Sequence, residues 1–124
     1  MITVLHGATL TVNGEGTIDC GVKDLMAVFQ LTHRDFANDA NPARLVINGG
    51  HYVGRSYCIC GNGNPGRGNT EIIINGGIFD TCSHNGVIIY NPQENSSVVI
   101  NGGKLVGCAT GIEMRSGNLT VNYG

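Results

Sequence analysis

The chain has 124 residues, of which 20 are glycine and 13% are charged, and its formal net charge is −2. This length corresponds to one domain, and its Ile- and Val-rich runs argue against a disordered chain. The small negative charge offers no basic surface for nucleic acid. No apolar run reaches the 18 residues that suggest a membrane-spanning helix. We therefore expect one globular domain over residues 1–124, without nucleic-acid or membrane partners.

A short motif recurs along the chain. Leu45–Gly50 reads LVINGG, Ile72–Gly77 reads IIINGG and Val98–Gly103 reads VVINGG, while LTVNG at Leu10–Gly14 and LTVNYG at Leu119–Gly124 are weaker copies. Its asparagines are Asn13, Asn48, Asn75, Asn101 and Asn122, at spacings of 35, 27, 26 and 21 residues. A period of this size without heptads is typical of a solenoid. Because stacked amides can hydrogen-bond along the stacking axis, we predict a structural asparagine ladder.

The three residues before each asparagine predict the first strand of a coil. Alternation in a strand places the first and third residues on one face, and both sets are aliphatic. The predicted inward residues are Leu10, Leu45, Ile72, Val98 and Leu119, with Val12, Ile47, Ile74, Ile100 and Val121. The middle residues, which we predict to point outward, are Thr11, Val46, Ile73, Val99 and Thr120.

Two further strands are predicted in each coil. The glycines after the asparagine allow a sharp turn, and large apolar residues then recur at Tyr52, Phe79 and Leu105, which we predict to point inward. A third strand is predicted at Tyr57–Cys60, Val87–Tyr90 and Ile112–Arg115. Its predicted inward residues are Cys58, Cys60, Val87, Ile89, Ile112 and Met114, which leaves Ile59 and Ile88 outward. The pattern predicts an all-β parallel β-helix (β-solenoid) of about five coils with three short strands per coil.

The first coil, residues 10–44, is less regular than residues 45–124. Val22, Leu25, Met26 and Phe29 have helical spacing, but residues 27–31 suit a strand, which we favour because the later coils need a partner there. The predicted connections, residues 32–44, 61–71, 91–97 and 116–118, all leave from one corner. We therefore expect them to lie on the same side of the solenoid.

The five cysteines are an odd number, which argues against a closed disulfide framework, and Cys58-x-Cys60 lacks the CxxC spacing of zinc or redox sites. Cys20, Cys82 and Cys108 each lie seven residues after a repeat asparagine. We predict that these three form a buried stack and that all five cysteines are reduced. The sequence suggests no metal site and no cofactor.

The INGG repeats at Ile47–Gly50, Ile74–Gly77 and Ile100–Gly103, with GIEMRSG at Gly111–Gly117, resemble the parallel β-helix proteins of the pectate-lyase-like superfamily. More closely, they resemble NGG-repeat modules of phage tail or virion proteins and of bacterial surface proteins. The resemblance covers about residues 10–124. It implies a right-handed solenoid, a virion or extracellular location, frequent trimers and carbohydrate as the commonest ligand.

Enzymes of that superfamily use clustered carboxylates on polysaccharides. No two acidic residues of the central coils fall at the same repeat position, and the scattered candidates are Asp80, His84, Glu113 and Arg115. We therefore expect no enzyme activity, with a polysaccharide lyase or glycoside hydrolase fragment as the alternative. A solenoid that binds ice or another flat surface needs a regular threonine row, which Val46, Ile73 and Val99 interrupt.

Val46, Ile73 and Val99 instead predict an outward apolar stripe, and such patches often mark interfaces. We expect a homo-oligomer, a trimer first, or contact with other subunits. Residues 1–9 lack the features of a signal peptide. The expected function is a non-enzymatic structural or attachment module of a phage virion (tail, fibre or capsid-decorating protein) or of a bacterial surface protein, in contact with carbohydrate or neighbouring subunits.

Overall fold

The computed structural model describes residues 1–21, 26–32, 41–61, 69–82 and 84–122. Much of the two longer predicted connections, 32–44 and 61–71, lies outside these residues. The helical alternative for Val22 and Leu25 lies outside them too. The competing strand is present, because Ala27–Thr32 forms β4.

In the part of the chain that the structure describes, fourteen strands make three parallel sheets. In sheet order, sheet A contains β1 (Ile2–Leu5), β4, β7 (Tyr57–Gly61), β10 (Val87–Asn91) and β13 (Thr110–Met114). Sheet B contains β2 (Thr9–Val12), β5 (Ala43–Ile47), β8 (Thr70–Ile74), β11 (Ser97–Ile100) and β14 (Asn118–Val121). Sheet C contains β3 (Thr17–Asp19), β6 (His51–Gly54), β9 (Ile78–Thr81) and β12 (Lys104–Leu105).

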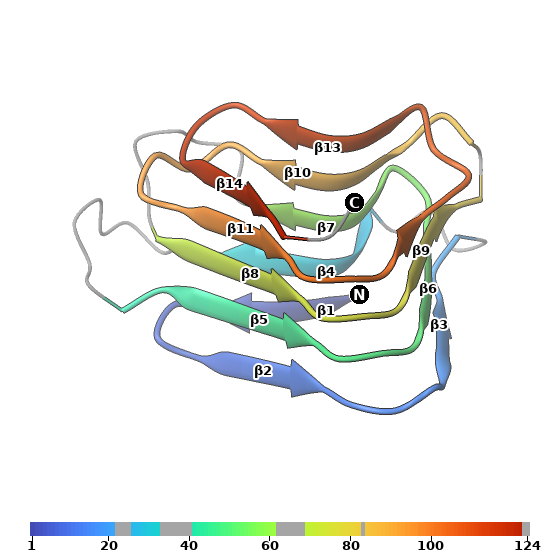
Figure 1. The fold of residues 1–124 in the computed structure, drawn as a ribbon, viewed down its shortest axis with the longest axis horizontal. Coiled ribbons are helices and arrows are strands. Elements are labelled where there is room, and N and C mark those ends of the chain that lie inside the picture. Colours follow the sequence, from blue (N-terminus) through green and yellow to red (C-terminus); the bar gives the residue numbers. More distant parts are fainter. Residues whose placement is uncertain (22–25, 33–40, 62–68, 83, 123–124) are drawn as a thin grey trace.

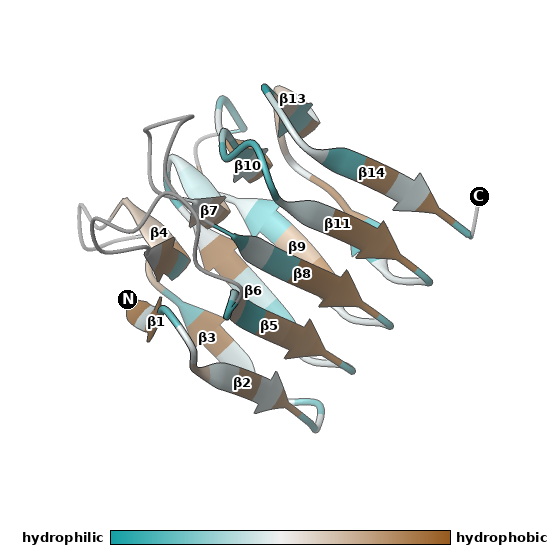
Figure 2. Ribbon diagram, turned by 90° about the vertical axis from the view of Figure 1, so that its left-hand side faces the viewer, coloured by the Kyte–Doolittle hydropathy of each residue, from teal (hydrophilic) through white to brown (hydrophobic). Residues whose placement is uncertain are grey.

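The strands follow one another in the order A, B, C, so the described chain winds through four full coils and the first two strands of a fifth. In Figure 1 the nearer sheet B runs left to right and the farther sheet A runs back, while the chain rises from β2 to β14. Figure 2 shows the same two sheets side by side. This winding is right-handed. The predicted fold, a parallel β-solenoid with three strands per coil, is confirmed.

The inward faces of sheet B build one side of the core. Leu45 and Ile47 are fully buried, as are their partners Ile72 and Ile74, and alternating burial runs through β5, β8 and β11 as predicted. The ends differ: Leu119 and Val121 are 42% and 55% exposed, although they continue the same stacks. Their exposure has a simple cause, since no described coil lies beyond β14.

Aromatic rings fill the corner between sheets A and C. The ring centroid of Tyr52 lies 5.1 Å from that of Phe79 and 5.2 Å from that of Phe29. The Tyr52 hydroxyl donates a hydrogen bond of 2.5 Å to the Gly49 carbonyl, so its polar end is satisfied. Tyr52 and Phe79 are buried and Leu105 packs against them half-buried, which confirms their predicted inward direction.

The prediction for the third strand is wrong in two respects. Val87, predicted inward, is half-exposed and lies outside the core cluster. Ile59 and Ile88, predicted outward, are fully buried in the core. Ile59 pairs with Phe29 and with Ile89 in one inward row. Cys58 is buried beside it because it points into the corner, where its thiol lies 2.9 Å from the Asp80 carbonyl oxygen and donates to it. Two consecutive residues can therefore face inward at the corner, and simple alternation fails there.

The glycine pair after each asparagine has two different roles. The second glycine has positive φ at Gly50, Gly77 and Gly103, between +97° and +106°, where side chains are strained. The first glycine lies against the preceding coil: a Cβ on Gly76 would be 2.9 Å from the Asn48 carbonyl oxygen. The motif therefore encodes a backbone turn and close coil-to-coil packing.

Candidate functional site

The outer face of sheet B carries three parallel rows of side chains. The first row is polar and contains Thr9, Arg44, Glu71, Ser97 and Asn118. The second row contains Thr11, Val46, Ile73, Val99 and Thr120 in direct register. The third row is the repeat asparagines, which follow the strand ends. An apolar row thus lies between two polar rows, on the most regular surface of the molecule.

The asparagine row is a continuous hydrogen-bonded ladder. The Nδ2 atom of Asn48 donates to Oδ1 of Asn13 at 2.7 Å, and Asn75 donates to Asn48 at 2.7 Å. Asn101 then donates to Asn75, and Asn122 to Asn101, both at 2.8 Å. Every bond runs in the same direction along the axis. The amides are therefore engaged with one another, which fits a structural role.

The apolar row is half-buried, because each side chain has a row neighbour in the next coil and polar rows on both flanks. On one flank Arg44 Nε and Glu71 Oε2 form an ion pair of 2.8 Å between adjacent coils. Val46, Ile73 and Val99 are all of intermediate exposure. The row is thus a narrow apolar strip whose side chains expose less area than three fully exposed Val and Ile side chains would.

The predicted buried cysteine stack is wrong. Cys20 is buried, but Cys108 is half-buried and Cys82 is exposed. Ile18 and Tyr52 are register partners. Ile18 lies five residues after Asn13, whereas Tyr52 lies only four residues after Asn48. Cys20 is therefore one position out of register with Cys82. All five cysteines are free of disulfide bonds in the structure, and burial raises the pKa of Cys58 to about 12 and of Cys60 to about 11.

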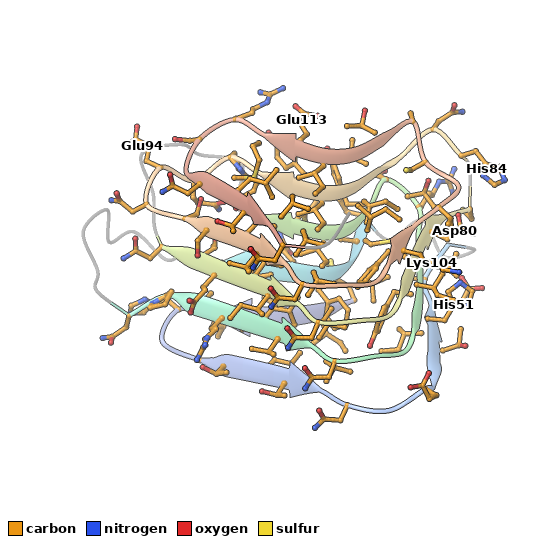
Figure 3. All side chains as sticks on the ribbon, in the orientation of Figure 1. His51, Asp80, His84, Glu94, Lys104 and Glu113 are labelled. Carbon is orange, nitrogen blue, oxygen red and sulfur yellow. The ribbon has the colours of Figure 1, made fainter. Side chains whose placement is uncertain are left out.

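The four scattered catalytic candidates do not form one site. Figure 3 places Glu113 at β13 of sheet A, and Asp80 with His84 at the right-hand side of the view. Arg115 bonds to Glu113 at 2.9 Å, so that pair stays together. Asp80 has a buried Oδ1 without a hydrogen-bond partner, and His84 has a φ of +53°. Among the residues whose positions are described, no group of three or more His, Cys, Asp or Glu side chains could hold a metal ion.

Sequence reasoning missed an aromatic cluster on sheet A. The rings of Tyr57 and Tyr90 lie 5.3 Å apart, and the Arg115 guanidinium lies 5.5 Å from the centroid of the Tyr90 ring. The pKa of Tyr57 is raised, chiefly because the side chain is partly buried and to a smaller extent because Tyr90 lies beside it. The two tyrosines are not register partners, since Tyr57 pairs with Val87 and Tyr90 with Cys60. Counting from the repeat asparagines could not bring them together.

A shallow groove of about 450 Å³ follows the glycine corner between sheets B and C. It is lined by Glu15, Gly50, His51, Gly76, Gly77, Ile78, Gly103 and Lys104. Its floor is largely glycine backbone, and its side chains carry both signs of charge. Figure 3 shows His51 and Lys104 on this side, and Ile78 of the coil between them is the register partner of both.

Within the described ranges, none of the chain forms a helix with the length and apolarity needed to cross a membrane. Comparison with known proteins gives no further assignment: no protein-family model, no curated protein and no solved structure matches the chain.

Proposed function

We propose that the chain is a non-enzymatic structural and attachment module of a phage virion (a tail, fibre or capsid-decorating protein) or of a bacterial surface assembly. In this proposal the outer face of sheet B packs against a neighbouring subunit, in a homotrimer first of all. The observation that carries the proposal is the in-register apolar row Val46–Ile73–Val99 on a regular five-stranded sheet. Such a row can meet an equally regular surface along its whole length.

The free energy that this row can supply shows how much of the surface the interface must include. Full burial of an exposed Val or Ile side chain contributes about 1.5–3 kcal/mol, and these three are already partly covered. The row then supplies a few kcal/mol, whereas association costs roughly 4–15 kcal/mol. The contact must therefore include the flanking polar rows, with Arg44 and Glu71 on one side and the amides on the other.

The placement of the acidic residues supports a non-enzymatic module over a polysaccharide lyase or hydrolase. A glycoside hydrolase needs two carboxyl groups roughly 5–10 Å apart across the scissile bond. Figure 3 shows Asp80, Glu94 and Glu113 in three separate parts of the fold. Incubation with acidic and neutral polysaccharides tests the alternative, since new reducing ends or unsaturated products would contradict the proposal.

Carbohydrate is the second contact that we propose, at the aromatic cluster of sheet A. The rings of Tyr57 and Tyr90 lie against each other at an interplanar angle of 31°, the Arg115 guanidinium lies over the Tyr90 ring, and Glu113 pairs with Arg115. Aromatic faces combined with a few polar groups are the usual composition of small-molecule sites. A sugar chain could lie along the rings and exchange hydrogen bonds with the charged pair.

Two variants of the same coil test the subunit contact. Ile73→Asp places a charge in the apolar row of sheet B, and Ile78→Asp places the same charge on sheet C, where Ile78 is 41% exposed. Light scattering should show that Ile73→Asp dissociates the lateral oligomer and that Ile78→Asp does not. Normal assembly of the Ile73→Asp chain would overturn the proposed contact.

A further inference from the structure

The two ends of sheet B carry the same four residues. Leu10–Thr11–Val12–Asn13 covers most of β2, the first strand of the sheet, and Leu119–Thr120–Val121–Asn122 covers most of β14, the last. Only these two coils have threonine in the middle row, where the three coils between them have Val46, Ile73 and Val99. Among the described strands, β2 and β14 each have a sheet neighbour on one side only, and these two strands are alike in sequence.

The hydrogen-bond pattern gives these two edges opposite polarity. Between successive coils, the backbone N–H of each repeat asparagine donates to the carbonyl of the last residue of the sheet B strand in the preceding coil. These bonds, of 2.7–3.0 Å, join Asn48 to Val12, Asn75 to Ile47, Asn101 to Ile74 and Asn122 to Ile100. The side-chain ladder runs the same way. Asn13 therefore has both donors directed away from the solenoid at one end. At the other end, the Val121 carbonyl and Asn122 Oδ1 are acceptors that receive no hydrogen bond from the described residues.

The apolar side chains at the two ends also match. Leu119 and Val121 are exposed at the end of stacks that begin with the half-buried Leu10 and Val12. On sheet A, Ile112 ends a row that passes through Ile89, Ile59 and Phe29 and begins with Ile2, which is 39% exposed. Each end thus shows an open section of the same core.

From this we infer that copies of the chain stack head to tail, with β14 of one copy pairing in parallel with β2 of the next. Asn13 N–H donates to the Val121 carbonyl, Asn13 Nδ2 donates to Asn122 Oδ1, and Leu119, Thr120 and Val121 lie against Leu10, Thr11 and Val12. β13 pairs with β1 in the same junction. Sheet C has four strands where the others have five, so one strand position stays open between β12 and β3.

This contact is heterologous, since two different surfaces meet and the association continues along the axis. The lateral contact of sheet B is a separate surface, and either contact can be absent without the other. Five strands of sheet B at about 4.8 Å each give an axial repeat of about 24 Å per copy. Exposed strand edges with unpaired backbone groups are templates for such pairing.

End-specific variants test the stacking. Backbone groups of successive strand residues point to alternate sides of the strand. In β2 the carbonyls of Ala8 and Val12 bond to the β5 side, so the N–H of Thr11 points to the open edge. In β14 the N–H groups of Asn118 and Asn122 bond to the β11 side, so the N–H of Val121 points to the open edge. Thr11→Pro and Val121→Pro each remove a junction donor and keep every internal hydrogen bond, which proline allows on an edge strand. Both are made in the Ile73→Asp chain, so that lateral association cannot contribute.

We expect each blocked chain to remain at 13.0 kDa in sedimentation, because each retains one functional end. An equimolar mixture should form a one-to-one complex of twice that mass and nothing larger. The chain with both ends free should form longer stacks with the repeat of about 24 Å in electron micrographs. A monomer at every concentration with both ends free, or self-association of either blocked chain, would overturn the inference.

A second variant keeps the test valid if proline disturbs the fold. Asn13→Asp still accepts the internal bond from Asn48 Nδ2, but its carboxylate cannot donate to Asn122 Oδ1 of the preceding copy. It should reduce stacking at least tenfold and leave the thermal unfolding of the isolated chain unchanged. Stacking of the Asn13→Asp chain with unchanged affinity would contradict the assigned junction.

Discussion

The carboxamide nitrogen of Asn48 lies 2.7 Å from the carboxamide oxygen of Asn13, although 35 residues separate the two in the chain. The same bond recurs at every coil up to Asn122. It ties the outer face of sheet B into one rigid unit. The regularity of this face is the basis of both associations proposed for the protein, one across the face and one along the axis.

The ladder should contribute to stability according to the number of bonds that each amide makes. Asn75 donates to Asn48 and accepts from Asn101, whereas Asn13 makes a single ladder bond. At about 0.5–1.5 kcal/mol per bond, Asn75→Ala should lower the free energy of unfolding by about 1–3 kcal/mol and Asn13→Ala by about half as much. Urea titration measures both. If both variants lost the same free energy of unfolding, the side-chain hydrogen bonds would not be the source of the ladder's contribution to stability.

The glycines allow the cost of the turn to be separated from the cost of packing. A Cβ on Gly16 meets nothing and its φ is ordinary; Gly14 has a φ of +100° and open space around it. Gly76 has only a close contact, and Gly77 has both a φ of +106° and a carbonyl oxygen at 3.1 Å. We expect Gly16→Ala to be neutral or slightly stabilising and Gly14→Ala to cost about 1–2 kcal/mol.

In the same series Gly77→Ala should be more destabilising than Gly14→Ala, since the backbone of the adjacent coil cannot move aside without breaking its own bonds. Thermal unfolding of the three alanine variants measures the order. If Gly14→Ala were as harmless as Gly16→Ala, positive φ would not be what the motif requires.

The two thiols of β7 should make stability depend on alkaline pH. Burial raises the pKa of Cys58 to about 12 and of Cys60 to about 11, from the model-compound value of 9.0. Because the folded state favours the neutral thiol, this contribution is complete below pH 9 and is lost as pH rises towards 11–12. The slope approaches 1.4 kcal/mol per pH unit for each thiol, at about 25 °C.

Urea titrations at pH 8–11 should therefore show a steeper loss of stability in the unmodified chain than in Cys60→Ala. Thiol labelling at pH 7.5 provides a second measurement. The exposed Cys82 should react first, and the buried Cys58 and Cys60 only on unfolding. Rapid labelling of all five thiols in the native protein would contradict the burial of β7.

The aromatic cluster should govern binding of sugar chains. Tyr90→Ala removes a ring that contacts both Tyr57 and Arg115, so affinity for a bound oligosaccharide should fall about tenfold or more, which corresponds to about 1.4 kcal/mol. Tyr90→Phe keeps the ring and should retain most of the affinity. Calorimetric titration compares the two. Equal affinities for Tyr90→Ala and the unmodified chain would remove the cluster from consideration.

The repeat predicted sheet B well because three constraints act on the same residues: alternation, the glycine turn and the amide ladder. Sheet A was predicted less well, because the chain enters β7 from a corner and places both Cys58 and Ile59 in the core. The cysteine stack failed in two ways. An extra residue in the first coil shifts Cys20 out of register, and Cys82 and Cys108, which keep the predicted offset, are exposed and half-buried. Tyr57 and Tyr90 touch although they are not register partners, so counting residues from the repeat asparagines cannot predict their contact.

Photocrosslinking from the apolar row tests the proposed subunit contact most directly. A photoreactive phenylalanine analogue replaces Ile73 in one chain and Ile78, the exposed residue of the same coil on sheet C, in a matched chain. Irradiation of the assembled protein should give a covalent dimer from position 73, with the crosslink in sheet B of the neighbour, and none from position 78. Crosslinking from position 78 alone, or from neither, would contradict a lateral interface on the outer face of sheet B.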